Sequence, residues 1–88
     1  MCGNNAYLPE GITFSSQEQI DSFQINYPYC TEIEGDVIID GNAITNLNGL
    51  NVLTFIGGDL RIWSNPILYS LAGLANLDSV GGNIIIHN

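Results

Sequence analysis

Positive charge is almost absent from this sequence. It contains no lysine and a single arginine, Arg61, against nine acidic residues, and its formal net charge at pH 7 is −8. Proteins that bind DNA, RNA or an anionic membrane surface neutralise phosphate groups with clustered lysine and arginine side chains. The composition therefore argues against nucleic acid as a partner, and we interpret the acidity as a source of solubility.

Long apolar runs and metal-ligating side chains are also scarce. No stretch approaches the roughly 18–20 apolar residues that cross a membrane as a helix, so we expect no membrane insertion. The only histidine is His87 and the only cysteines are Cys2 and Cys30, which are too few soft ligands for a zinc site. Neither a glycine-rich phosphate loop nor a plausible catalytic constellation is present. We predict no metal, no cofactor and no enzymatic activity.

The two cysteines allow three interpretations. Cys2 and Cys30 form a disulfide in a secreted protein, which would stabilise so small a chain, or both stay free thiols, as in a cytosolic protein. Cys2 followed by Gly3 also suits the lipid anchor of a bacterial surface protein. We favour the disulfide. The first residues show no signal peptide, and we expect that a leader has been removed.

The sequence does contain one short motif that occurs three times, and we call this motif the phrase. Residues 35–39 read Gly-Asp-Val-Ile-Ile, residues 58–62 read Gly-Asp-Leu-Arg-Ile, and residues 82–86 read Gly-Asn-Ile-Ile-Ile. The copies begin 23 and then 24 residues apart (35 to 58, 58 to 82). A fixed period in this range is typical of a solenoid. We therefore predict a mainly β fold with coils at residues 35–57 and 58–81 and the start of a third at 82–88.

Alternation within the phrase separates an inward from an outward face. Side chains along a strand point to opposite faces in turn, so the apolar columns Val37/Leu60/Ile84 and Ile39/Ile62/Ile86 are predicted to fill the core. The Asp or Asn that follows the first glycine of each phrase lies at a corner, where its side chain bonds the backbone. In the second half of each coil a leucine recurs every three residues, which fits a short helix or 3₁₀ segment as well as strands bent at corners. Gly49 and Gly73 argue against a stable helix there, so we favour short strands and turns.

One helix is predicted ahead of the repeat. Ser15 and Glu18 fit a capping box, and apolar residues follow at helical spacing before Pro28 ends the pattern. These apolar residues are Ile20, Phe23 and Tyr27. We therefore expect a lead-in and capping helix over residues 1–29, with the helix at about 16–27, and coils over 30–88, all within one domain.

The repeat resembles a known family. Residues 30–39, Cys-Thr-Glu-Ile-Glu-Gly-Asp-Val-Ile-Ile, are similar to the opening of receptor L domains, the leucine-rich-repeat-like domains of insulin- and epidermal-growth-factor-type receptors. The coils that follow resemble those of secreted L-domain-like proteins of Bacteroidetes. The resemblance implies a right-handed parallel β-helix with one N-terminal capping α-helix and a disulfide between Cys2 and Cys30. It also implies a secreted or cell-surface protein that binds or adheres without catalysis.

The outward positions supply a candidate binding stripe, which consists of Asp40, Arg61, Trp63 and His87. Neighbouring strands lie about 4.8 Å apart, so Asp40, Trp63 and His87 would form one ladder, with Arg61 beside it. Tryptophan and arginine are enriched at binding hot spots, and a tryptophan also stacks on sugar rings. The ligand, a protein or a carbohydrate, is not specified by the sequence. The alternative is that Trp63 packs beneath a neighbouring segment.

The third copy of the phrase has no successor. Val80, Ile84, Ile85 and Ile86 would form an apolar end with an unpaired strand edge, which invites pairing with another chain. We expect the domain to be truncated or completed by a partner. The predicted function is extracellular binding or adhesion without enzymatic activity. The alternative is a self-assembling structural subunit that stacks end to end, as a homo-oligomer, into a filament.

Overall fold

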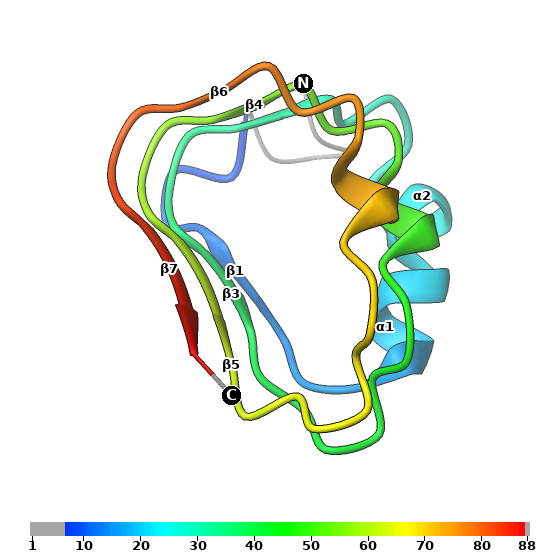
Figure 1. Cartoon of the computed structure of the whole chain (residues 1–88). Helices are drawn as coiled ribbons and strands as arrows, with labels where there is room; N and C mark the ends of the chain where they lie inside the picture. Colours follow the sequence, from blue (N-terminus) through cyan, green and yellow to red (C-terminus); the bar gives the residue numbers. More distant parts are fainter. Residues whose placement is uncertain (1–6, 88) are drawn as a thin grey trace.

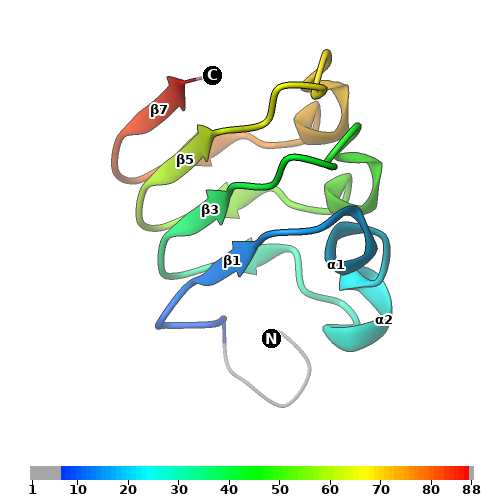
Figure 2. The same cartoon turned by 90° about the horizontal axis from the view of Figure 1, so that it is seen from below.

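The computed structural model describes residues 7–87. Within this range, two sheets of parallel strands run side by side (Figures 1 and 2). The four-stranded sheet has the order β1 (Ile12–Phe14), β3 (Val37–Ile39), β5 (Leu60–Trp63) and β7 (Ile84–His87). The three-stranded sheet has the order β2 (Glu32–Ile33), β4 (Phe55–Ile56) and β6 (Ser79–Val80). Successive strands of the chain thus alternate between the sheets from β1 to β7.

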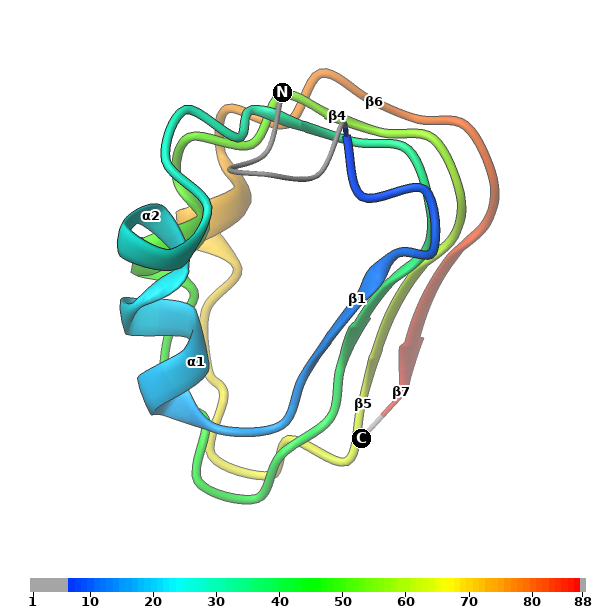
Figure 3. The same ribbon diagram turned by 180° about the vertical axis from the view of Figure 1, so that it is seen from behind.

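Short helices form the third side of the molecule. They are α1 (Gln17–Asp21), α2 (Phe23–Asn26) and the 3₁₀ helices η1 (Asn48–Leu50) and η2 (Ala72–Leu74). α1 and α2 both contact η1, and η1 contacts η2. Figure 3 shows this helical side across from the four-stranded sheet, with the core between them.

The prediction of a right-handed parallel β-helix with one N-terminal capping helix is wrong. The described residues form two small parallel sheets and two short α-helices. α1 and α2 do not lie across the end of the stack, because they occupy the same side as η1 and η2 (Figure 2). An 88-residue chain is also too short for a β-helix built from many coils of 23 residues.

Strand register follows the spacing of the repeated phrase. Val37 pairs with Leu60, which in turn pairs with Ile84. Val37 and Leu60 are no more than 3% exposed, as the inward pattern predicts. Ile84 and Ile86 occupy the same inward columns but are 59% and 53% exposed, because β7 is the last strand in the order of its sheet.

The helix expected over 16–27 is divided into α1 and α2 at Ser22. The predicted capping box at Ser15 and Glu18 is wrong by one position. Ser16 is the N-cap: its Oγ accepts a hydrogen bond from Gln19 N–H at 3.2 Å, and Gln19 Oε1 accepts one from Ser16 N–H at 3.2 Å. The shift places Ile20 and the Phe23 ring in the core, where both are buried.

Glycine on the helical side has a steric purpose that the sequence reasoning misjudged. Short strands and turns were expected around Gly49 and Gly73, yet both lie inside 3₁₀ helices. A Cβ atom on Gly49 would collide with Ile20 O, and one on Gly73 would collide with Leu47 O. Because only glycine lets the backbones approach this closely, these residues set the spacing between successive helical turns.

The sequence reasoning also missed β1, within a segment expected to be irregular. Ile12 pairs with Val37, and its N–H donates to Asp36 O at 2.9 Å. Gly11, with φ of +81°, stands opposite Asp36, where the later phrases carry Asp or Asn. The replacement of the corner residue by glycine hid this first strand from the repeat pattern.

Candidate functional site

The outer face of the four-stranded sheet carries the predicted binding stripe. Arg61 and Trp63 are two residues apart on β5, so they point to the same face. Arg61 Nη2 lies 2.9 Å from Asp59 Oδ2, and its guanidinium carbon lies 6.0 Å from the centroid of the Trp63 ring. The arginine is therefore held between a carboxylate and an aromatic ring, while both Arg61 and Trp63 keep part of their surface exposed.

The other two stripe residues lie on the neighbouring strands. His87 is the register partner of Trp63, on β7. Asp40 directly follows β3, one position beyond the Ile39–Ile62 pair, and its N–H donates to Phe14 O at 2.9 Å. Both are exposed. The structure thus places Trp63 and His87 side by side on neighbouring strands, with Arg61 two residues before Trp63 on β5 and Asp40 directly after the end of β3.

Asp59 links the stripe to the corner of the sheets. Its Oδ1 accepts a hydrogen bond from Asn83 N–H at 2.9 Å, and its own N–H donates to Asp36 Oδ1 at 2.8 Å. The bond from Asn83, and after it the Arg61 guanidinium, hold the pKa of the Asp59 carboxyl below its ordinary value of 3.8. Asp59 stays ionised near neutral pH and fixes the position of Arg61.

The predicted assembly end is apolar and open. Ile84, Ile85 and Ile86 are all exposed, and Val80 on β6 is half-buried. Two further large side chains are exposed nearby, Tyr69 at 85% and Leu71 at 39%. Tyr69 and Leu71 line a small depression together with Ile86.

Cys30 is buried and disulfide-bonded. Its expected partner, Cys2, lies outside the described residues. No free thiol occurs in the part of the chain that the structure describes.

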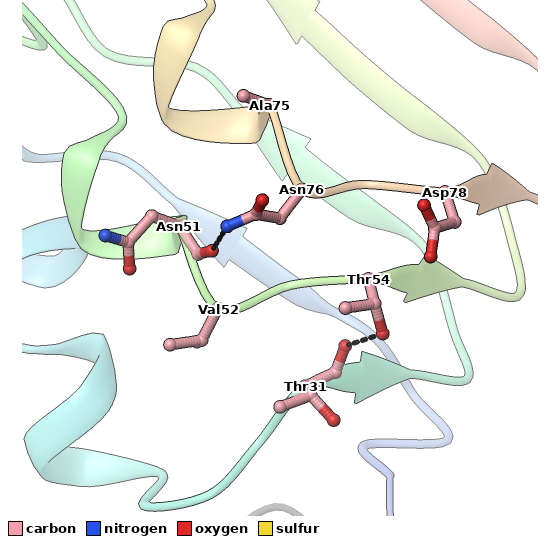
Figure 4. Close-up of a pocket in the computed structure, with 7 residues that line it drawn as sticks. All are labelled: Thr31, Asn51, Val52, Thr54, Ala75, Asn76 and Asp78. Atoms are coloured by element: carbon pink, nitrogen blue, oxygen red, sulfur yellow. Dashed lines mark hydrogen bonds between the residues drawn. The ribbon is translucent and has the colours of Figure 1, made fainter.

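Sequence reasoning missed two adjacent depressions on the side of the three-stranded sheet. The larger has a volume of about 640 Å³ and a lining that is about half polar (Figure 4), and the smaller, of about 390 Å³, is lined by Tyr27 and Tyr29 among others. Thr31 and Val52 line both. We call the combined depression the Thr31 groove. The residues of the groove used below are Gln24, Tyr27, Pro28, Tyr29, Thr31, Asn51, Val52, Thr54, Asn76 and Asp78.

A signal for this groove is present in the repeat. Thr31, Thr54 and Asp78 each precede by two positions an inward apolar residue of β2, β4 or β6. Backbone bonds join them, since Thr54 N–H donates to Thr31 O at 2.7 Å and Asp78 N–H donates to Thr54 O at 2.8 Å. A comparison of the column formed by Thr31, Thr54 and Asp78, and not only of the phrase itself, would have found this polar row.

The described residues contain neither a membrane-spanning helix nor a cluster of metal ligands. None of their helices has the length and apolar character needed to cross a membrane. Across residues 7–87, no three His, Cys, Asp or Glu side chains gather as a metal site.

The comparisons with known proteins identify no relative. The chain matches no protein-family model, and no curated protein and no solved structure matches it significantly. The resemblance to receptor L domains therefore stays a prediction.

Proposed function

We propose that this chain is a binding or adhesion module without enzymatic activity, located outside the cell or on its surface. The observation that carries the proposal is the arrangement of Arg61 and Trp63 on the outer face of β5 with Asp59, which directly precedes that strand. An arginine held by both a carboxylate and an aromatic ring loses little side-chain freedom when a ligand binds. Arginine and tryptophan are also the residue types that dominate binding energies.

The disulfide at Cys30 supports the location. Disulfides persist in oxidising environments and are rare in the cytosol. The lack of lysine, with a single arginine, favours a protein or carbohydrate ligand over a polyanion, because polyanions need several cations for affinity.

A binding assay with immobilised probes tests the proposal. The disulfide-intact chain is applied to gelatin, mucin, chitin and cellulose, and the dissociation constant is measured for each probe that retains it. Trp63→Ala should weaken retention at least tenfold, since an aromatic hot spot contributes at least about 2 kcal/mol, and should shift Tm by only a few degrees. Tyr69→Ala is the matched control, because Tyr69 is an exposed aromatic outside the stripe.

Two results would contradict the proposal. The first is retention by none of the probes. The second is a large loss of stability in Trp63→Ala, which would make Trp63 a structural residue and not a contact for a ligand.

The exposed end supports a second candidate, self-assembly through Val80, Ile84, Ile85 and Ile86. Three consecutive exposed isoleucines on a terminal strand offer both apolar surface and an edge that another strand can pair with. Sedimentation velocity of the 88-residue chain at micromolar concentration should show concentration-dependent association, and Ile86→Lys should abolish it. A monomer at all concentrations would exclude strong stacking.

A further inference from the structure

The polar half of the Thr31 groove has side-chain hydrogen-bond donors and acceptors that are available to a ligand. Asn51 Oδ1 accepts from Gln24 Nε2 at 3.0 Å and Asn76 Nδ2 donates to Asn51 O at 2.7 Å. Within the described residues, these bonds leave Asn51 Nδ2, Asn76 Oδ1 and the Asp78 carboxylate without a protein partner. The lining thus offers both a donor and acceptors, and sugar hydroxyls both donate and accept.

Two backbone carbonyl groups of the groove, in contrast, are already hydrogen-bonded within the chain. Thr31 O accepts from both the N–H and the Oγ1 of Thr54, at 2.7 and 3.2 Å. Thr54 O accepts from the N–H groups of Asp78 and Ser79. Figure 4 shows the Thr54–Thr31 and Asn76–Asn51 bonds crossing between neighbouring segments. Because an added peptide strand is recognised through open backbone groups, Thr31 O and Thr54 O are not available for β-strand addition.

The other half of the groove presents aromatic side chains on a constrained backbone. Tyr29 is 92% exposed and has φ of +65°, in the left-handed region. It lies between Pro28, whose ring fixes φ, and the disulfide-bonded Cys30. Tyr27 packs its ring against Phe23 with centroids 5.6 Å apart. A non-glycine residue persists in this conformation only where its surroundings impose it, so the backbone that carries the exposed Tyr29 side chain is constrained.

The charged residues of the groove restrict the class of ligand that it can bind. The groove has no cationic side chain, and its one carboxylate is that of Asp78, so an anionic ligand would be repelled. We propose that the Thr31 groove binds a neutral polysaccharide, with sugar faces stacked on Tyr29 and Tyr27 and hydroxyl groups bonded to Asn51, Asn76 and Asp78. This inference rests on the proposed function of a binding module and assigns it a ligand class and a second site.

Calorimetric titration of the disulfide-intact chain with neutral hexasaccharides tests the assignment. The probes are cellohexaose, mannohexaose and chitohexaose, and at least one should bind with a Kd below about 1 mM. Tyr29→Ala should weaken that binding about tenfold through loss of stacking, and Asp78→Asn should weaken it several-fold. Both residues are exposed, so neither change should unfold the protein. Tyr69→Ala, which lies outside the groove, should leave Kd within twofold.

Two outcomes would overturn the assignment of the groove. The first is that none of the three sugars binds, and the second is that Tyr29→Ala and Tyr69→Ala weaken sugar binding equally. Trp63-dependent retention on gelatin or mucin without any hexasaccharide binding would overturn the groove alone and leave the proposed function standing. Failure to bind any probe or sugar would overturn both. Tyr29-dependent binding of gelatin without sugar binding would identify the groove as a peptide site instead.

Discussion

Asn65 fixes Gly41 across the four-stranded sheet: its Oδ1 accepts a hydrogen bond from the Gly41 N–H at 2.8 Å, although the two residues are 24 positions apart. Its Nδ2 donates to Ile39 O at 2.8 Å and to Trp63 O at 2.7 Å. Asn65 is 1% exposed, so water cannot replace these partners. One side chain therefore ties the ends of two neighbouring strands together.

Asn65→Ala should lower the free energy of unfolding by about 2–4 kcal/mol, because it leaves several buried backbone groups without partners. Urea denaturation followed by circular dichroism measures the change. Asn42→Ala is the control, since Asn42 is exposed and should change stability by no more than about 0.5 kcal/mol. Equal effects of the two variants would contradict this role for Asn65.

The Asp59 carboxyl should make the free energy of unfolding depend on pH. Its pKa is lowered in the folded chain by Asn83 N–H and Arg61, so the stabilisation is complete well above the ordinary value of 3.8 and is lost as pH falls through the lower folded pKa. Asp59→Asn keeps an oxygen that accepts the Asn83 bond but removes the ionisation. Urea midpoints measured between pH 6 and 2 should fall less steeply for the variant. Identical pH profiles would show that Asp59 does not contribute.

Gly73→Ala should destabilise the chain by 2 kcal/mol or more, about the cost of overpacking a close contact, although alanine is the better helix former. The added Cβ would collide with Leu47 O. Ala72→Gly, at the exposed neighbouring position in η2, is the matched control and should cost about 1 kcal/mol or less. Thermal denaturation measures the stability of both variants. A Gly73→Ala variant that is more stable than the original chain would refute the steric role of Gly73.

Reduction of the disulfide at Cys30 should lower stability by about 2–4 kcal/mol, the usual contribution of such a bond. The comparison is between urea midpoints with and without a thiol reductant. Reduction of the disulfide should also weaken any binding that depends on Tyr29, since Cys30 constrains the adjacent backbone. A reduced chain with unchanged stability and unchanged hexasaccharide affinity would contradict both expectations.

The sequence predicted the strand columns because their signal is local and repeated. Val37 and Leu60 share an environment in neighbouring strands, so they share a residue type at a fixed spacing. The helical side could not be predicted in the same way, because a leucine every three residues, as at Leu47, Leu50 and Leu53, fits a short 3₁₀ helix and a bent strand alike. There glycine at position 49 or 73 serves a contact with another segment, which propensity does not describe.

The sequence by itself determined the register of β3, β5 and β7, the division into inward and outward side chains, and the placing of Arg61 and Trp63 on one face. Only the tertiary structure decided that helical turns, and not strands, fill the third side, and that Tyr29 and Asp78 border one groove. The reason is physical. Alternation along a strand acts over two residues, whereas a groove depends on which distant segments the closely packed backbones bring together.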